Sequence, residues 1–327
     1  YLRILFGRCQ LVTFPSTDTH MEKIDVIYID PPPYNTGNEF TFNDYKVEKE
    51  DSYKHSKWIS YMNKRLTLSK RLLSDKGVIF ISIDDNEQAQ LKILCDEIFG
   101  KDNFIAQIIV VSNRKGRHYL EIAVMHEYVL CYSKKLDVLL NKLPKNMEDK
   151  KHEDKKGKYE LWELWNRNPK FNKGNRPNLF YPVYVNESIT DEYKNCAVSL
   201  TKNDDYNIEI FPRNKEGLDG CWRWSKKKFL ENIITDDPIS SELVAKKRRD
   251  QGWNLYQKSR SDSSHSKSVW DEKEMTTETG TIELRNIFHG SVFDHPKPVE
   301  LIRKIIMLAT TKNSIILDFM AGSGTTG

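Results

Sequence analysis

A carboxylate, a run of prolines and an aromatic ring follow an apolar segment in the order Asp30-Pro31-Pro32-Pro33-Tyr34. The apolar segment 26–29 predicts a buried strand that ends in a rigid turn. Prolines lack a backbone donor, so their carbonyl oxygens remain as acceptors beside the carboxylate, and the tyrosine offers a flat face on which a base can stack. The pattern predicts a pocket for the amino group of a flipped nucleobase.

A glycine-rich turn near the other end of the chain forms a second candidate site. The apolar run 315–317 ends in Asp318, and Gly322 and Gly324 follow. Such a turn permits close backbone approach to a ligand and presents backbone amides to a carboxylate or phosphate. Lys297 stands between prolines before a helical apolar pattern, which predicts a cation near such a ligand, with an ordinary solvated lysine as the alternative.

The exocyclic amine of a base is a poor nucleophile because its lone pair is delocalised into the ring. Asp30 and the carbonyl of Pro31 or Pro32 would accept the amine hydrogens and direct the lone pair towards an electrophile held nearby. A base inside a duplex must first be extruded, at about a few kcal/mol, and stacking on Tyr34 would offset part of this. This chemistry needs neither a metal nor a covalent intermediate.

These segments resemble the motifs of amino-directed DNA methyltransferases. The run 30–34 is similar to their Asp-Pro-Pro-Tyr motif, and Asn35-Thr36-Gly37 extends it towards the adenine-specific branch that accompanies type III restriction systems. Segment 314–326 resembles the S-adenosylmethionine loop, and 293–298 resembles the segment that closes over the methionine end of that cofactor. Segments 77–87 and 278–284 are also similar, so the likeness covers most of the chain and is loosest in the middle.

The resemblance implies a Rossmann-like methyltransferase fold in the permuted β-class order, with the catalytic motif before the cofactor loop. It implies S-adenosyl-L-methionine as the cofactor and double-stranded DNA as the substrate. A homodimer, a separate restriction subunit and a cytoplasmic location are implied as well. The implied catalytic residues are Asp30, Pro31, Pro32 and Tyr34, and the implied cofactor contacts are Lys297, Asp318, Phe319, Gly322, Gly324 and Thr325.

The elements that must position these residues follow from apolar spacing. Residues 59–73 predict a helix with Gly77 beyond its end, 78–83 a buried strand, and 88–99 a helix ended by Gly100. Strands that alternate with helices predict an α/β fold with a doubly wound, mostly parallel sheet. The resemblance divides this fold into a catalytic half, 1–112, and a cofactor-binding half, 261–327.

Residues 113–260 differ in character and predict an inserted α+β target-recognition region. Within it, 142–158 predicts a flexible surface loop, and the polar segment 261–267 predicts a linker that follows it. Two basic runs could neutralise DNA phosphates, although solvated helix faces are the more common explanation of such runs, and the nearby tryptophans could be core residues. The candidate DNA contacts are Lys226, Lys227, Lys228, Lys246, Arg248 and Arg249.

Composition narrows the class of protein. The formal net charge of +4 and the pI of about 8.6 are only mildly basic, so a nucleic-acid footprint must come from local patches. The five cysteines lack CxxC spacing, which argues against a zinc site or a secreted disulfide framework and fits a reduced cytosol. No apolar stretch approaches the roughly 18 residues of a membrane span, so a soluble chain is expected.

The chain departs from the family pattern at two points. A third proline lengthens the catalytic turn by up to about 3.5 Å, and the chain ends at Gly327, where the family continues into a helix and a strand, so weaker cofactor binding is expected. The poorly matching start, 1–19, also suggests a fragment. The leading hypothesis is a DNA adenine-N6 methyltransferase, the modification subunit of a type III system; cytosine-N4 methylation and a catalytically inactive DNA-recognition fragment stay open.

Overall fold

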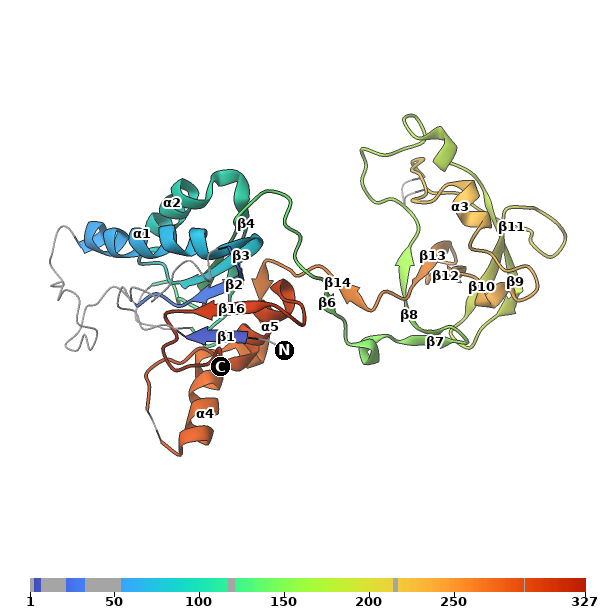
Figure 1. Cartoon of the computed structure of the whole chain (residues 1–327). Coiled ribbons are helices and arrows are strands. Elements are labelled where there is room, and N and C mark those ends of the chain that lie inside the picture. Colours follow the sequence, from blue (N-terminus) through green and yellow to red (C-terminus); the bar gives the residue numbers. More distant parts are fainter. Residues whose placement is uncertain (1–2, 7–21, 33–53, 117–120, 214–216, 291) are drawn as a thin grey trace. The chain divides into compact units, whose positions relative to one another are not determined.

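The structure, a computed structural model, describes residues 3–6, 22–32, 54–116, 121–213, 217–290 and 292–327. Two compact units are present: unit 1 comprises residues 1–143 and 265–327, and unit 2 comprises residues 144–264. Each unit has its own sheet and core (Figure 1). The two are described separately below.

Unit 1 contains a seven-stranded sheet with the order β1-β16-β2-β3-β5-β4-β15. Four of its six strand pairings are parallel, and β5 runs antiparallel to both of its neighbours. The strands are β1 (Arg3–Phe6), β16 (Ile315–Asp318), β2 (Ile24–Ile29), β3 (Leu73–Ile83), β5 (Glu127–Ser133), β4 (Phe104–Val110) and β15 (Val269–Trp270).

Helices cover both faces of this sheet. Alternate residues of a strand point to opposite sides, so β2 contributes side chains to a core on each face. Ile27 and Ile29 pack in the same core as Met62 of α1 (Lys54–Leu72) and Leu91 of α2 (Gln88–Phe99). Val26 and Tyr28 pack in a second core with residues of α5 (Val299–Ala309). Helix α4 (Thr277–Phe288) and the short 3₁₀ helices η2 (Lys101–Asn103) and η6 (Lys273–Met275) complete the unit. The predicted α/β, doubly wound, mostly parallel fold is confirmed.

Gly77 does not mark the end of a helix as predicted. Helix α1 ends at Leu72, and β3 begins at the next residue. Gly77 lies inside β3, where a Cβ atom would sit 2.8 Å from the Ile24 carbonyl oxygen. The glycine therefore permits the close approach of two strands. Helix α2 begins at Gln88 and ends at Phe99, as predicted, and Gly100 follows with a φ of 99°.

The chain enters unit 2 later than the sequence indicated. The predicted insertion begins at 113, yet β5 lies between β3 and β4 in the sheet of unit 1, and the division between the units falls at 143/144. On the return, the division falls at 264/265 rather than 260/261. The two connecting segments pair as a two-stranded sheet of β6 (Leu143–Pro144) and β14 (Ser263–Ser264), so the segment predicted to be a linker is partly ordered.

Unit 2 is built on a seven-stranded antiparallel sheet in the order β11-β9-β10-β12-β13-β8-β7. Trp222, Trp224 and Phe229 belong to its core, so the core interpretation of these two tryptophans is confirmed. The elements are β7 (His152–Asp154), β8 (Gly157–Glu163), β9 (Val183–Thr190), β10 (Asn195–Ser199), β11 (Ile208–Ile210), α3 (Lys226–Leu230), β12 (Leu243–Lys247), β13 (Trp253–Ser259), η3 (Met147–Asp149), η4 (Pro177–Leu179) and η5 (Pro238–Ser240).

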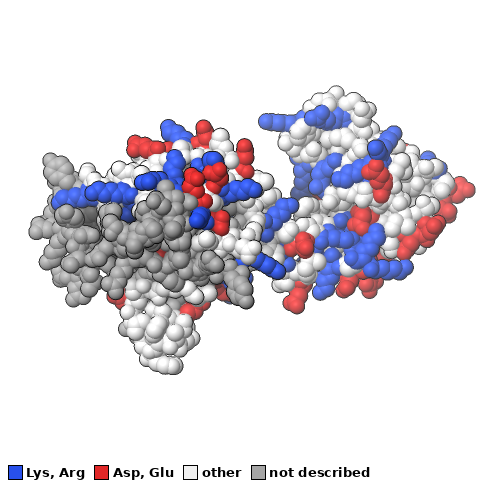
Figure 2. Space-filling view, in the orientation of Figure 1, with Lys and Arg blue, Asp and Glu red and all other residues white. Residues whose placement is uncertain are grey.

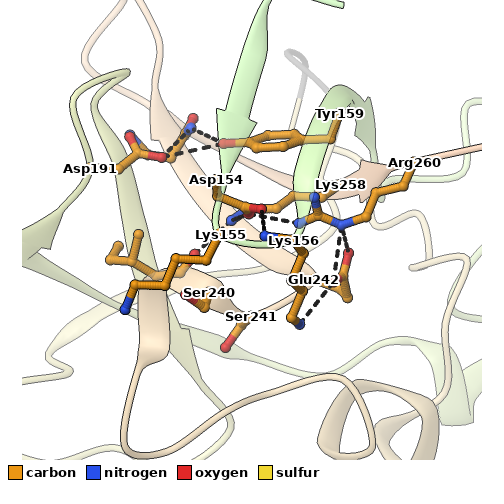
Figure 3. Close-up of polar contacts among 12 residues, drawn as sticks. Asp154, Lys155, Lys156, Tyr159, Asp191, Ser240, Ser241, Glu242, Lys258 and Arg260 are labelled. Atoms are coloured by element: carbon orange, nitrogen blue, oxygen red, sulfur yellow. Dashed lines mark hydrogen bonds and ion pairs between the residues drawn. The ribbon is translucent and has the colours of Figure 1, made fainter. Parts of the chain in front are cut away.

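The predicted flexible loop 142–158 is wrong, because β7 and the start of β8 form a hairpin there. A buried ion network holds this hairpin in place (Figure 3). Asp154 accepts from the ammonium of Lys258 at 2.7 Å and from the guanidinium of Arg260 at 2.6 Å, and the Lys258 side chain is fully buried. Burial alone would raise the pKa of Asp154, but Arg260 and Lys258 outweigh it and lower that pKa to about 2.

We expect Asp154→Asn to destabilise unit 2 by about 3–5 kcal/mol, because it leaves the buried Lys258 without its counter-charge. Urea unfolding followed by tryptophan fluorescence measures this, since five of the seven tryptophans lie in unit 2. Lys155→Ala, which breaks the exposed pair with Asp237, is the control and should cost less than about 1 kcal/mol.

The same comparison has a pH dependence. A carboxyl with a lowered pKa contributes stability above its unfolded pKa, near 3.9, and loses it as the pH falls towards the folded value of about 2. The difference between the wild type and Asp154→Asn should therefore shrink below pH 4. A difference that is constant down to pH 2 would contradict an ionic origin.

Candidate functional site

Those predicted catalytic and cofactor residues that the structure describes come together near one edge of the sheet of unit 1. Asp30 directly follows β2, and Asp318 is the last residue of the neighbouring parallel strand β16. Strand β5 runs the other way, so its first residue, Glu127, lies at the same edge. The carboxyl ends of parallel strands are where ligands bind in open α/β sheets.

Lys297 lies between two carboxylates at this edge. Its ammonium nitrogen is 2.6 Å from Oε2 of Glu127 and 3.4 Å from Oδ1 of Asp30. The side chains of Lys297 and Glu127 are 18% and 17% exposed, and that of Asp30 is 35% exposed. Asp30 therefore keeps the more accessible carboxylate while sharing the charge of the lysine.

Helix α4 supports the segment that carries Lys297. A Cβ atom at Gly280 would lie 2.5 Å from the Pro296 carbonyl oxygen, so only glycine permits this approach. Glu283 accepts a hydrogen bond from the backbone of Val299 at 2.9 Å, one residue beyond the second proline. These contacts fix the position from which the lysine reaches the sheet edge.

The electrostatics of the three groups follow from this geometry. Burial raises the pKa of Asp30, Lys297 opposes the rise, Glu127 adds to it, and the result is about 6. Burial also disfavours the charge of Lys297, but the two carboxylates outweigh it and raise the pKa of the lysine above its usual value. Asp30 is thus an ionised acceptor at neutral pH that can take up a proton slightly below it.

The proline turn is described only in part. Pro31 is buried, and the carbonyl oxygen of Pro32 accepts a hydrogen bond from Nε1 of Trp58 at 3.2 Å. One lone pair of Pro32 is therefore used by α1, which favours Pro31 as the second acceptor for an amine. Tyr34 and its neighbours 33 and 35–37 lie outside the described residues.

The glycine-rich loop after β16 is held by its own side chains. Asp318 is buried, which raises its pKa, and it accepts from the backbone of Met320 at 3.0 Å and from the hydroxyl of Thr326 at 2.5 Å. The hydroxyl of Thr325 donates to the Lys297 carbonyl at 3.0 Å, which joins this loop to the lysine segment. Phe319 is partly buried and packs against the core beneath α1 and α2.

The backbone of this loop suits a bound cofactor. Gly322 and Gly324 have φ values of 55° and 80°, and no heavy atom lies within 4 Å of a Cβ built at Gly324. A Cβ at Gly322 would lie 3.2 Å from the ring of Phe293, which belongs to the segment before α5. Open, left-handed glycines at a strand end can present backbone amides to a ligand, so the loop fits the predicted S-adenosylmethionine site.

The basic runs of unit 2 lie on separate elements. Lys226 to Lys228 begin α3 and are exposed, and Lys228 lies 4.3 Å from the ring centroid of Trp224. Lys246 belongs to β12, while Arg248 pairs with Asp250 at 3.0 Å and Arg249 is exposed. Their contact with DNA stays a prediction.

Glu127 is the site residue that the sequence analysis missed. It is the first residue of β5, two positions before the buried residues 129–133, so it is a charged residue at the start of a strand, as Asp30 is a charged residue after one. Recognition of β5 as a member of the first sheet, antiparallel to β3, would have placed it at the site.

The described residues contain neither a metal-binding cluster nor a membrane-spanning helix. In the part of the chain that the structure describes, His, Cys, Asp and Glu form no cluster of three that could hold a metal ion. Within the same residues, no helix has the length and apolar character needed to cross a membrane.

Comparison with known proteins identifies the family. Residues 24–327 match the model of the N6/N4 DNA methylase family, and the chain belongs to that family. It is 34% identical to the EcoPI Mod subunit, a type III restriction-modification enzyme of Escherichia phage P1, over 94% of this chain and 51% of that protein. It is 36% identical to the type II methyltransferase M.KpnI of Klebsiella pneumoniae, over 94% of this chain and 71% of that protein.

Among solved structures, a DNA modification methylase of Thermus thermophilus covers 100% of this chain and 82% of its own, with a TM-score of 0.41 and 12% identity. The chain spans about half the length of the Mod subunit that it matches. The chain thus belongs to the N6/N4 DNA methylase family and is similar to type III Mod subunits.

The charge arrangement predicts opposite pKa changes for Asp30 in two variants. Glu127→Gln should lower the pKa of Asp30 from about 6, because a nearby negative charge is removed. Lys297→Met should raise it, by about 1–3 pH units for loss of a close opposite charge. The ¹³Cγ chemical shift of labelled aspartate measures both. Lys304→Met is the control and should leave the pKa of Asp30 unchanged, because Lys304 pairs with Glu272. If both site variants changed the pKa of Asp30 in the same direction, the proposed charge arrangement of Asp30, Glu127 and Lys297 would be wrong.

Proposed function

We propose that this chain transfers a methyl group from S-adenosyl-L-methionine to N6 of a flipped adenine in double-stranded DNA. The observation that carries the proposal is the Asp30 carboxylate, held by Lys297 at the end of β2 and beside the glycine-rich loop that follows β16. An acceptor at this edge can hold an amine, and the loop can hold the methyl donor.

The residues of the chain would act on the amine as acceptors. Asp30 and the carbonyl oxygen of Pro31 would take the two amine hydrogens, which leaves the nitrogen lone pair directed away from the plane of the base. Lys297 keeps Asp30 ionised against the effect of burial. Stacking on Tyr34 would hold the base in place once it has left the duplex.

The bound cofactor would supply the methyl group on a sulfonium, and Gly322, Gly324 and Thr325 are the residues proposed to hold it. Transfer of that methyl group to the amine, with the cofactor leaving as a neutral thioether, would leave the amine nitrogen with one proton to lose. Asp30, with a pKa of about 6, can accept that proton and release it to water. The methyl transfer therefore needs no oxidant or reductant.

Adenine is the proposed base because the motif begins with Asp30 and continues through Asn35-Thr36-Gly37, which resembles the adenine-specific branch. Relatives named as type III Mod subunits support a role as a modification subunit. The proposal includes a separate restriction subunit as partner, a homodimer and a cytoplasmic location, which are implied by the family resemblance alone. Cytosine-N4 transfer uses the same acceptor chemistry and is therefore an outcome that the test must resolve.

Nucleoside mass spectrometry on mixed-sequence DNA, incubated with the chain and S-adenosylmethionine, tests the proposal. N6-methyladenine should accumulate, and Asp30→Ala should reduce its rate at least about a hundredfold through loss of a positioned acceptor. N4-methylcytosine would reassign the base. Absence of any methylated base, with the cofactor bound and the chain folded, would reject methyl transfer by this chain.

The rate should also depend on pH through Asp30. Below about pH 6 the carboxyl is protonated and loses the negative charge that strengthens its acceptor role, so kcat/KM should fall about tenfold for each further pH unit until it approaches the rate of Asp30→Asn. Asp30→Asn keeps an oxygen acceptor that does not titrate, and we expect it to be slower but insensitive to pH over this range. A wild-type rate that is flat from pH 7 to 4.5 would show that Asp30 does not act as an ionised acceptor.

A further inference from the structure

Unit 2 has an open depression of about 490 Å³ at the end of strands β8 and β13. Its lining combines aromatic rings with two guanidinium groups. The lining residues are Leu161, Trp162, Glu163, Trp165, Arg167, Arg223 and Tyr256.

Arg223 is a cation of this depression without a carboxylate partner. Its guanidinium donates to the backbone carbonyl of Glu163, and among the described residues it forms no ion pair. Burial lowers its pKa, and Glu163 only partly opposes this. A guanidinium carries five N–H donors in a planar fork, so a partly desolvated one that uses few of them is suited to bind an external acceptor.

The neighbouring carboxylate of Glu163 does not act as the partner of the Arg223 guanidinium, because other side chains already occupy it. Glu163 accepts from Arg167 at 2.7 Å through one oxygen and from Asn254 at 2.8 Å through the other. The amide of Asn254 also donates to the hydroxyl of Tyr256 at 3.1 Å. The rim of the depression is thus a connected polar network that fixes its shape and leaves Arg223 unneutralised.

The aromatic walls favour a flat ligand. Trp162 is 43% exposed, which is high for so large an apolar side chain. Trp165 lies so close to the backbone of Gly220 that a Cβ there would be 2.5 Å from the indole nitrogen, so this wall depends on a glycine. Base edges in the grooves are read by hydrogen bonds and apolar contacts, whereas phosphates are bound by charged and polar groups, so apolar rings beside a guanidinium favour a base edge as the ligand.

The net positive charge of unit 2 favours a nucleic acid as the ligand. The whole formal net charge of +4 falls within residues 144–264, and the rest of the chain is balanced. Figure 2 shows Lys and Arg side chains on the visible face of this unit, with Asp and Glu side chains among them. A surface of this sign attracts the DNA backbone, while the depression offers the contacts that distinguish one base from another.

We propose that this depression reads one base pair of the DNA target, with Arg223 donating to the paired acceptors on the major-groove edge of a guanine. The proposal rests on the proposed function, since it assigns part of the DNA selectivity of the same enzyme. The fork of arginine matches guanine O6 and N7, the commonest specific contact of this kind. Trp162, Trp165 and Tyr256 are the aromatic residues among those that line the depression.

Selection from a random duplex library by the full chain, followed by sequencing, tests this without requiring methyl transfer. The wild type should enrich a motif that contains a guanine. Arg223→Ala should lose the preference at that one position and bind the selected duplex about 5- to 150-fold more weakly. Arg223→Lys keeps the charge without the fork and should retain overall binding but not the guanine preference.

Arg213→Ala is the matched control, because Arg213 lies in the same unit but is paired with Asp219 at 2.8 Å; its motif should equal that of the wild type. Uniform weakening across all sequences in both Arg223 variants would make it a phosphate contact and overturn the proposal. An unchanged motif, or no enrichment by the wild type, would overturn it as well. Asp30-dependent methylation is measured separately, so failure of this proposal and failure of the proposed function are distinguishable.

Discussion

One ammonium group shared by two carboxylates organises the candidate site. Asp30, Glu127 and Lys297 come from three distant parts of the chain, and a partly buried charge that lost its partners would carry a desolvation cost. The lysine therefore ties the end of β2, the start of β5 and the segment before α5 to one another. The contacts of Gly280 and Thr325 with that segment serve the same arrangement.

The parallel sheet explains why the order of the motifs along the chain has little effect on the geometry. Strands β2 and β16 are neighbours, with Ile27 opposite Leu317, although nearly the whole chain separates them. Their carboxyl ends must lie at one edge whichever comes first. Asp25 strengthens this pairing, because its carboxylate accepts from the backbone of Ile315 at 2.9 Å and from the hydroxyl of Ser74 at 3.2 Å. A chain that carries the two motifs in permuted order therefore brings the same residues together at that edge of the sheet.

The sequence predicted what depends on local pattern, including the fold class, helix α2 and the position of Asp30 after a strand. It failed where the partner is remote. Glu127 acquires its role from Lys297, and the hairpin 152–163 is ordered by Lys258 and Arg260 about a hundred residues later. Polar residues in such segments indicate a loop when read locally, and only the fold supplies the opposite charges. The boundary at 113 failed similarly, because an antiparallel strand interrupted the expected alternation.

Two cationic side chains of unit 2, Lys258 and Arg223, differ in how many partners they have. This difference indicates a structural role for the first and a ligand-binding role for the second. Lys258 is fully buried, yet it has a carboxylate, a carbonyl oxygen and an aromatic face around it, so nothing is left for a ligand. Arg223 is more exposed and has only a backbone carbonyl. Because Arg223 is exposed, the lack of an ion pair costs the fold little, and the free donors of its guanidinium remain available to a ligand. Leaving it unneutralised makes sense where the partner arrives with the substrate, as the acceptor-rich edge of a base would.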